Sequence, residues 1–538
     1  MNSAMIVAAQ PESTETGALI LKRGGNAVDA AMACALVQGV VDPMMCGIAG
    51  FGSLQIYMPA KGVHTYIDFH GKAPSAVRPD MWQDLIDGET RDGFGFILKG
   101  NVNDVGYQSI TVPGSLKAYY EAVNEFGTMD WADIVQPAID AAEAGVLIRP
   151  HVHFWYTLRD QLGRVDNEDR LRFSKTGREI YFDDNGDALR PGMILKNPDM
   201  ANTLRRIAKA GADIFYKGEI AEEIAADMAA NGGLLSKQDL ADYQTTRVDP
   251  LWGNYRGYRV ATNNPPGGGL MMVEMMNILE NFDLASLGHN SVDYIRIVAE
   301  AMKFGTIDKD AFIGDPNFVD VPVGRLSDKA YAAEIAAKIK AGKRANVTRV
   351  VHAEESKDTT QVSVLDRHGN AVSMTHSLGM PSGVITDGLG FIYNGCMGVF
   401  DPRPGHADSL APGKSRFSAM APSVVFKGDN PDPYLVIGAP GGTQINIGVM
   451  QAILNVLDFD MGILEAISAP RFSATSNAID VMNRIPRFIT DELAADGYDI
   501  IRNPLGFGIA AVHGIKNQNG QLSGAADPGH DGIALAVN

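Results

Sequence analysis

The 538-residue sequence has only three cysteines, Cys34, Cys46 and Cys396, and they lie far apart. Three are too few for a disulfide framework, and their spacing fits no zinc-binding motif. We therefore expect the thiols to be buried as small hydrophobic side chains. The histidines also lack metal-ligand spacing. His151 and His153, which would share one side of a strand, are more typical of a packing feature than of a metal site. No metal and no other cofactor is expected.

Long hydrophobic runs are also missing. The sequence contains no run of the length, about 18 apolar residues, that a helix needs to cross a bilayer. Near the N-terminus, the apolar stretch covers only residues 4–9, which is shorter than the core of a signal peptide, and no basic segment precedes it. The sequence therefore predicts a cytoplasmic protein without membrane contacts, unless an export signal has been removed.

Basic residues are in the minority. Lys and Arg number 46 against 64 Asp and Glu, which gives a formal net charge of −18. The acidic residues are scattered rather than grouped, so they indicate a solvated surface and not an acidic tail. A chain of this charge is a poor partner for nucleic acids and for anionic membranes.

Periodicity predicts a helix-rich first part and a strand-rich last part, without internal repeats or low-complexity segments. Helices are expected at residues 14–22, 27–41, 115–126, 133–144, 200–210, 220–231, 273–281 and 292–304. Strands are expected at 53–57, 423–426 and 434–437. Asp29, inside the second of these helices, is interpreted as a structural hydrogen-bonding group.

Two short alternating runs, residues 359–366 and 371–378, flank a Gly-Asn turn and predict a β-hairpin that begins at Thr359. A threonine hydroxyl is a poor nucleophile unless a nearby base takes its proton. If the chain is cut between Asp358 and Thr359, the freed α-amine, whose ordinary pKa is about 7.7–8.0, can serve as that base. The polar run 352–357 resembles the exposed connector that such a cleavage needs. Taken alone, the Thr pair indicates an ordinary hairpin with threonine on its exposed face.

Other motifs occur together with this hairpin. In chain order these are residues 24–31, 112–115, 126–129, 418–423 and 438–443. Together with the hairpin they resemble the γ-glutamyltranspeptidase family, the glutathione hydrolases and their acylase relatives, over nearly the whole chain. The resemblance implies an α/β fold, the four-layer αββα sandwich of the N-terminal-nucleophile hydrolases. It also implies self-cleavage into a large subunit, residues 1–358, and a small subunit, residues 359–538. The two subunits would remain one intertwined fold, and whether this heterodimer forms homo-oligomers stays open.

The same resemblance assigns roles to single residues. Thr359 would be the catalytic nucleophile, and Gly441 and Gly442 would supply the backbone N–H groups of an oxyanion hole. From local sequence alone, a plain turn at the two glycines is about as well supported. Thr375 and Ser377, which share one face of the second hairpin strand, match hydroxyl residues near the family's nucleophile.

Substrate recognition is where the sequence departs from the family. Ser418 matches a serine that contacts the substrate carboxylate, but the family's carboxylate-binding arginine is replaced by His70, which cannot form a bidentate contact. Other polar positions of the glutamyl site are also replaced, here by Gly379, Cys396, Val399 and Ala419. Each lost contact to a charged group costs about 1.5–3 kcal/mol. The sequence therefore predicts weak cleavage of glutathione.

Three functions remain open at this point. The first is a self-processing amidohydrolase or acyltransferase that acts on γ-glutamyl or other small amides. The second is an acylase-type hydrolase, like the oxamate- or cephalosporin-cleaving relatives, without glutathione activity. The third is a non-catalytic binding scaffold, and the intact Thr359, Gly441 and Gly442 argue against it.

Overall fold

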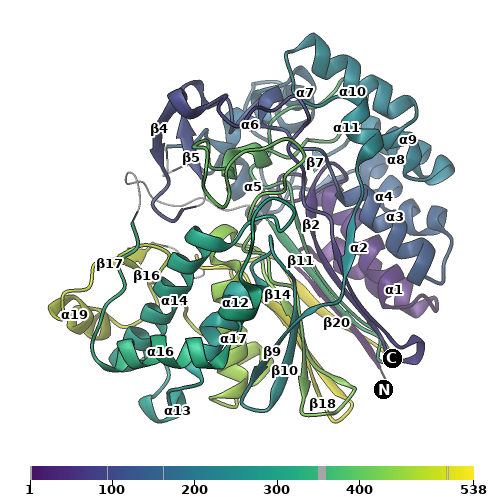
Figure 1. Ribbon diagram of the computed structural model, residues 1–538. Coiled ribbons are helices and arrows are strands. Elements are labelled where there is room, and N and C mark those ends of the chain that lie inside the picture. The colour runs from purple at the N-terminus through teal and green to yellow at the C-terminus, as the bar shows by residue number, and fades with distance from the viewer. Residues whose placement is uncertain (1–2, 94, 161–162, 349–358, 505, 507) are drawn as a thin grey trace.

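The computed structural model describes residues 3–93, 95–160, 163–348, 359–504, 506 and 508–538. Two large β-sheets stack face to face at its centre, and helices cover the outer face of each (Figure 1). This is the four-layer αββα sandwich that the sequence predicts. The two ends of the chain lie close together, because the first strand pairs with the last.

Both large sheets are antiparallel throughout and mix strands from the two sides of residue 359. The first has the order β20 (Ile533–Val537), β1 (Ala4–Ala8), β11 (Thr360–Leu365), β12 (Ala371–Ser377), β2 (Phe51–Met58), β3 (Val63–Asp68), β8 (Thr246–Val248). The second has the order β19 (Gln521–Ala526), β18 (His513–Gln518), β14 (Pro433–Gly438), β13 (Ser423–Lys427), β10 (Tyr258–Thr262), β9 (Leu251–Tyr255). Thus the first part of the chain, predicted to be helix-rich, also supplies strands to both sheets.

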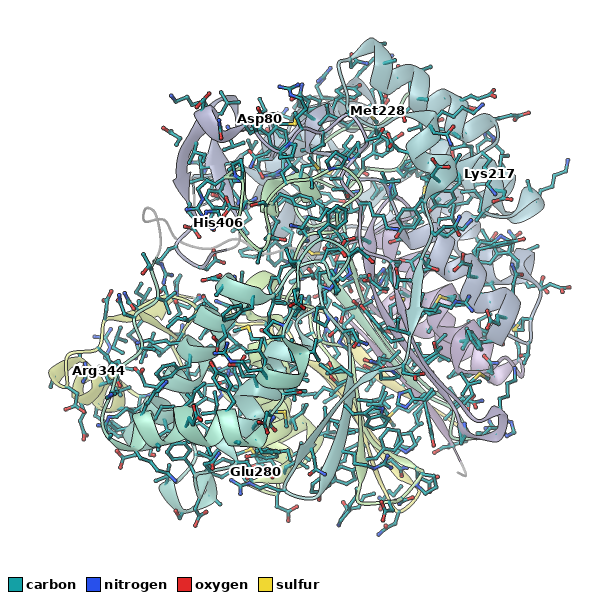
Figure 2. All side chains as sticks on the ribbon, viewed as in Figure 1. Asp80, Lys217, Met228, Glu280, Arg344 and His406 are labelled. Carbon is teal, nitrogen blue, oxygen red and sulfur yellow. The ribbon has the colours of Figure 1, made fainter. Side chains whose placement is uncertain are left out.

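Helices form the two outer layers. On the side of the first sheet lie α1 (Pro11–Lys22), α2 (Ala27–Val41), α3 (Ser115–Phe126), α4 (Trp131–Ala144) and α8 (Pro198–Ala210). On the side of the second sheet lie α12 (Gly269–Leu279), α14 (Val292–Phe312), α16 (Lys329–Lys340), α17 (Ile445–Leu457) and α18 (Ile463–Ser468). Charged side chains such as Lys217 and Arg344 lie at the periphery (Figure 2).

Further helices and three small sheets complete the described fold. They include α5 (Pro150–Thr157), α6 (Asn167–Arg172), α7 (Lys175–Tyr181), α9 (Asp213–Tyr216), α10 (Glu219–Ala230), α11 (Lys237–Asp242), α13 (Leu284–Leu287), α15 (Val323–Leu326) and α19 (Arg487–Ala495). Small sheets are formed by β4 (Ile86–Glu89) with β5 (Phe96–Leu98), by β6 (Val146–Leu147) with β7 (Ile194–Leu195), and by β15 (Phe472–Ser473), β16 (Ile479–Met482) and β17 (Ile500–Asn503).

The predicted hairpin forms the centre of the first sheet, and its alternation decides which side chains face which layer. Val362 and Val364 belong to the core beneath α1 and α2. Leu365 points the other way and packs with Val436 and Ile515 of the second sheet. Because neighbouring side chains on a strand point to opposite faces, every second residue of β11 lies between the two sheets.

Two structural expectations, on the cysteines and on Asp29, are confirmed. All three cysteines are buried, and none of them forms a disulfide. Asp29 caps the start of α2, where it accepts hydrogen bonds from Asn26 N at 2.8 Å and from the Thr128 hydroxyl at 2.6 Å. Among the described residues, none of the helices combines the length and the apolar character that crossing a bilayer would take.

Other expectations need correction. His151 and His153 lie in helix α5 and not in a strand, so two residues at this spacing do not share a face. Helix α12 begins at Gly269 rather than at residue 273, and α14 continues to Phe312 rather than ending at residue 304. In α14 a side chain at Gly305 would come within 3.0 Å of Met275 Cγ. This glycine therefore serves close helix packing and does not end the helix.

Candidate functional site

Thr359 directly precedes β11 and is 4% exposed. Thr360 pairs with His376 across the hairpin, so Thr359 lies next to Ser377. The Thr359 Oγ1 and Ser377 Oγ atoms are 3.2 Å apart, and either can be the donor. Ser377 Oγ also accepts a hydrogen bond from Gly379 N at 2.8 Å. The pair lies on the face of the first sheet that looks toward the second. Asp358 and the connector 352–357 lie outside the described residues.

The predicted oxyanion glycines approach the same place from the second sheet. Strand β14 ends at Gly438, and Gly441 and Gly442 follow with φ of +139° and +55°. Both values favour glycine. A side chain at Gly441 would lie 2.6 Å from Ala510 Cα. Gly442 opens the turn that leads into α17, and the first N–H groups of a helix have no partner within it. The two glycines therefore lie in the turn before α17, and each lines a cavity that Thr359 also lines.

Two cavities meet at Thr359, which lines both. Gly441 belongs to the larger cavity, of about 290 Å³, and Gly442 to the smaller one. A group bound at the hydroxyl could therefore extend to either side of the glycine pair. This is the arrangement an acyl-transfer site needs, with the acyl part and the leaving group on different sides of the nucleophile.

Aromatic side chains line the larger cavity: His151, Phe154, Trp155 and His530. The His151 and His530 rings lie 4.4 Å apart between centroids, and Trp155 Nε1 donates to His151 Nε2 at 2.8 Å. Burial lowers the pKa of His151 to about 4 and that of His530 well below its ordinary value. Both rings are therefore neutral at neutral pH, and this wall of the cavity is uncharged.

The smaller cavity collects most of the residues that the sequence singles out for substrate binding. Ser377 and Ser418 line it, as do three of the positions that depart from the family, Gly379, Val399 and Ala419. Cys396 lies next to Gly379: a side chain at position 379 would come within 3.0 Å of the Cys396 sulfur. The substitutions thus lie around Thr359 rather than being spread over the surface.

Two predicted residues lie outside the described lining of both cavities. His70 is held by Asp68, with Nδ1 at 2.5 Å from Oδ1, and its ring packs against Phe51, which does line the smaller cavity. Thr375 is buried between the sheets and donates to Gln361 Oε1 at 2.5 Å. Gln361 also donates to the Ser373 hydroxyl at 3.1 Å, so Thr375 is part of a polar network beneath the site.

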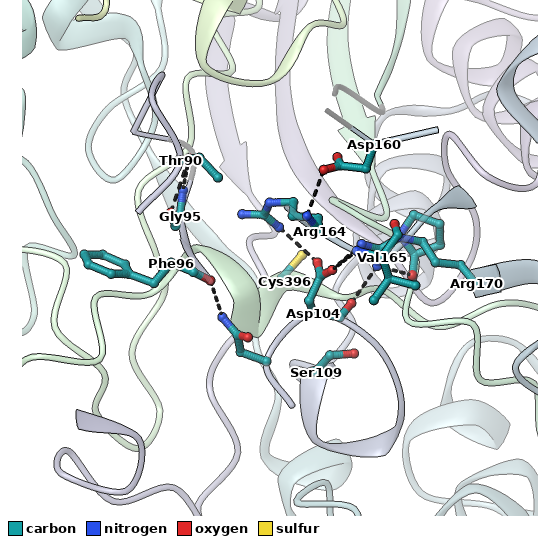
Figure 3. A network of polar contacts seen from close by, with 12 residues as sticks. Thr90, Gly95, Phe96, Asp104, Ser109, Asp160, Arg164, Val165, Arg170 and Cys396 are labelled. Carbon is teal, nitrogen blue, oxygen red and sulfur yellow. Dashed lines mark hydrogen bonds and ion pairs between the residues drawn. The ribbon is translucent and has the colours of Figure 1, made fainter. Parts of the chain in front are cut away.

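A buried network fixes the wall that carries Val399. The turn Cys396–Val399 packs against the loop that contains Gly95. That loop also lies close to Arg164, because a side chain at position 95 would come within 2.6 Å of Arg164 Nη2. Figure 3 shows Asp104 between Arg164 and Arg170, with ion-pair distances of 3.0 and 2.5 Å. Burial alone would raise the pKa of Asp104, but the two guanidinium groups hold it below its ordinary value.

Sequence reasoning missed Arg416, which lines the smaller cavity together with Thr359 and Ser418. Its guanidinium lies 4.7 Å from the centre of the Phe51 ring. The available signal was an arginine two residues before Ser418. The aromatic wall was also missed, because His530 is distant in sequence and meets His151 and Trp155 of α5 only through the fold.

Comparison with known proteins identifies the family. The model of the family described as gamma-glutamyltranspeptidase matches residues 13–537. The chain belongs to the γ-glutamyltranspeptidase family. The "Acylase ACY 1 proenzyme" of Pseudomonas sp. (strain SE83) is 37% identical over 99% of this chain and 93% of its own length. The "Glutathione hydrolase proenzyme" of Bacillus subtilis (strain 168) is 32% identical over 99% and 91%.

Experimental structures of other proteins are similar in fold to this γ-glutamyltranspeptidase-family chain. The cephalosporin acylase from Bacillus halodurans superposes with a TM-score of 0.86, at 28% identity, over 99% of this chain and 95% of that one. The γ-glutamyltranspeptidase of Helicobacter pylori gives 0.56 at 32% identity, over 63% and 92%. The chain is therefore an amidohydrolase of the N-terminal-nucleophile class.

Proposed function

We propose that the chain cleaves itself between Asp358 and Thr359 and then hydrolyses a small amide other than glutathione through an acyl-enzyme on Thr359. The observation that carries the proposal is the position of the Thr359 hydroxyl. It lies 3.2 Å from Ser377 Oγ, where two cavities meet beside the glycine pair Gly441 and Gly442. The names of the relatives, which are proenzymes of an acylase and of a glutathione hydrolase, fit both steps.

Self-cleavage would convert one peptide bond into two new chain ends. Thr359 Oγ attacks the carbonyl carbon of Asp358, and its proton passes to the departing nitrogen as the C–N bond breaks. The resulting ester joins Asp358 to the Thr359 side chain until water hydrolyses it. The products are a carboxylate at residue 358 and a free α-amine at residue 359, which is the base that the second reaction requires.

Substrate hydrolysis would repeat this chemistry with an external amide. The α-amine takes the hydroxyl proton as Oγ attacks the amide carbonyl, and backbone N–H groups at Gly441 and Gly442 stabilise the oxyanion. The proton then passes to the leaving amine, the C–N bond breaks, and the acyl group remains on Oγ. Water, deprotonated by the same amine, releases the carboxylic acid and restores the hydroxyl.

Acylase-type specificity is favoured over glutathione hydrolysis by the walls of the smaller cavity. A γ-glutamyl group carries both an ammonium and a carboxylate at its far end. Val399 and Ala419 line this cavity at the positions where the family holds polar groups for the glutamyl group, with Cys396 behind them. The described lining residues include no carboxylate that could bind an ammonium group.

Processing is tested with the purified chain on a denaturing gel and by intact mass. We expect two fragments, the smaller beginning at Thr359, that elute together under native conditions. Thr359→Ala should give one uncut, inactive chain, and Thr359→Ser should still be cut. Thr360→Ala is the matched control for the neighbouring threonine and should be cut at the same bond. A different N-terminus for the smaller fragment would refute the assignment.

Specificity is tested on protein that has been shown to be cut. We expect weak or absent release of aniline from a γ-glutamyl anilide. A kcat/KM of about 10⁴ M⁻¹s⁻¹ or more, which is ordinary for an enzyme on its own substrate, would establish a glutamyl site and contradict the proposal.

A further inference from the structure

We propose that the larger cavity beside Thr359 binds an uncharged aromatic group of the substrate, with Trp155 as the residue that determines this specificity. The inference rests on the proposed function, because it names the substrate class of the same site. The chemistry that the cavity recognises is one aromatic ring, carried by either the acyl side or the amine side of the scissile amide.

The two cavities at Thr359 differ greatly in size. The smaller one, of about 20 Å³, has space for about one water molecule, so it accepts a group no larger than a methyl or an amino group. The larger one has a volume of about 290 Å³. A protein cavity of about 150 Å³ can hold benzene. The bulk of a substrate bound at the Thr359 hydroxyl therefore belongs in the larger cavity.

One face of a short helix builds most of the aromatic wall of the larger cavity. His151, Phe154 and Trp155 are spaced i, i+3 and i+4 along α5, which places their side chains on the same side of the helix. The fourth ring, His530, comes from the loop between β19 and β20. Its centroid lies 4.4 Å from that of His151 and 6.4 Å from that of Trp155. Three of the rings are half-buried and Phe154 is 37% exposed, so a further ring in the cavity can pack against them.

Trp155 is held in a fixed position within this wall. Its Nε1 donates to His151 Nε2 at 2.8 Å. Because a neutral imidazole carries a single N–H, this bond leaves the His151 proton on Nδ1. Phe154 packs edge-on against Trp155, with 5.6 Å between the ring centroids. An aromatic surface that is ordered in advance loses little freedom when a ring binds to it.

The described lining of the larger cavity contains no charged side chain. Burial lowers the pKa of His151 to about 4 and that of His530 well below its ordinary value, so both imidazoles are neutral at neutral pH. Arg149, directly before α5, is paired with Asp531 at 2.8 Å and with Glu12 at 3.4 Å. A charged group in the cavity would lose its hydration without gaining a partner, so the wall favours an uncharged ring.

The test compares aromatic amides with saturated counterparts of the same skeleton. On the amine side the pair is N-benzylacetamide and N-(cyclohexylmethyl)acetamide, and on the acyl side it is phenylacetamide and cyclohexylacetamide. For cut wild-type protein we expect the aromatic member to exceed the saturated one at least about threefold in kcat/KM on one of the two sides, because ring pairs contribute beyond their buried area. That side identifies the part of the substrate that enters the larger cavity. A para-carboxylate on the ring should lower kcat/KM at least about tenfold relative to a para-carboxamide.

Variants of the wall show whether it is the source of this preference. In Trp155→Leu the preference for the aromatic member should disappear, and in Phe154→Ala it should decrease. Phe488→Ala is the matched control, since it removes a phenylalanine that is 71% exposed on α19 and lines neither cavity. This control should keep the preference, and self-cleavage should persist in all three variants.

A second measurement does not depend on turnover. The neutral compound 4-nitrobenzyl alcohol, whose nitro group quenches indole fluorescence, should quench the fluorescence of wild-type protein saturably. Of the four tryptophans, Trp155 lines the larger cavity, and Trp82, Trp131 and Trp252 do not. The saturable part should therefore be lost in Trp155→Leu, and in Phe154→Ala half-saturation should need a higher concentration.

The assignment is overturned if cut wild type shows no aromatic preference on either side, or if its quenching does not saturate. It is also overturned if the preference survives in Trp155→Leu, if it disappears in Phe488→Ala, or if the para-carboxylate is the better substrate. By contrast, a chain that is not cut at Thr359 would refute the proposed function, and saturable quenching by the neutral ring would still decide what the larger cavity binds.

Discussion

The orientation of the Thr359 hydroxyl depends on a second hydroxyl. Ser377 Oγ is close enough to exchange a hydrogen bond with Thr359 Oγ1, and its position is fixed by the backbone N–H of Gly379. A nucleophile held in this way spends more time aimed at the amide carbon, and such preorganisation lowers the barrier. We therefore propose that Ser377 is a positioning residue.

Ser377→Ala should lower kcat/KM by roughly tenfold to a hundredfold, because a hydrogen bond to a group that becomes charged contributes about 1.5–3 kcal/mol. Self-cleavage should slow as well, since it uses the same hydroxyl. The measurement is the rate of both reactions in wild type and variant. Thr306→Ala in α14, which lines neither cavity, is the control. Its hydroxyl donates to Met302 O at 2.8 Å, so its loss should leave the rate constants nearly unchanged. Equal effects of the two substitutions would contradict a specific role for Ser377.

At the scale of elements, the sequence predicts best where local pattern alone determines structure. The hairpin that carries Thr359 and Ser377 is found within one residue of its expected limits, because alternation and the turn at Gly369 are both local signals. The beginning of α12 is missed because it falls in a glycine run that is typical of a loop; Gly268, the residue before the helix, packs against the backbone of Ala419.

The site residues also differ in whether local sequence alone can indicate them. The residues found by resemblance, such as Ser418, lie in short contiguous motifs. Arg416 and the aromatic wall at His151 and His530 become functional candidates only when loops from distant parts of the chain are brought together. The hydrophobic periodicity of a sequence does not indicate whether an arginine side chain faces a cavity.

The turn that carries Val399 is supported by the buried Asp104, and this can be tested. Asp104→Asn leaves Arg164 and Arg170 buried without their shared counter-charge, which should destabilise the fold by about 3–5 kcal/mol. The apparent thermal midpoint should drop by several degrees. Glu168→Gln, which removes a half-exposed pair with Arg172, is the control and should change stability by less than about 1 kcal/mol. A stable Asp104→Asn protein would show that the arginines are neutralised by other groups.

At the scale of the whole molecule, buried neutral histidines couple folding to pH. Burial lowers the pKa of His376 and His513 to about 3 and that of His64 to about 4. In the unfolded chain these groups titrate near their ordinary value of about 6.5. Between the two values the unfolded chain binds more protons than the folded one. The stability that they contribute is therefore complete above pH 6.5 and is lost as the pH falls below it. Buried carboxyls with raised pKa, such as Asp42 at about 6, act in the opposite direction.

Because these effects partly cancel, a single variant isolates the histidine contribution better than the acid stability of wild type. The variant His513→Gln removes a fully buried imidazole that must stay neutral in the folded protein. Between pH 6.5 and 4.5 wild type should lose roughly 2–3 kcal/mol more than the variant, since each unit of pKa difference corresponds to about 1.4 kcal/mol. The measurement is the thermal midpoint of both proteins across this range, and the variant should show the shallower decline. His406→Gln, at a half-exposed histidine, should follow the wild-type curve. Parallel curves for wild type and His513→Gln would mean that His513 is protonated within the fold.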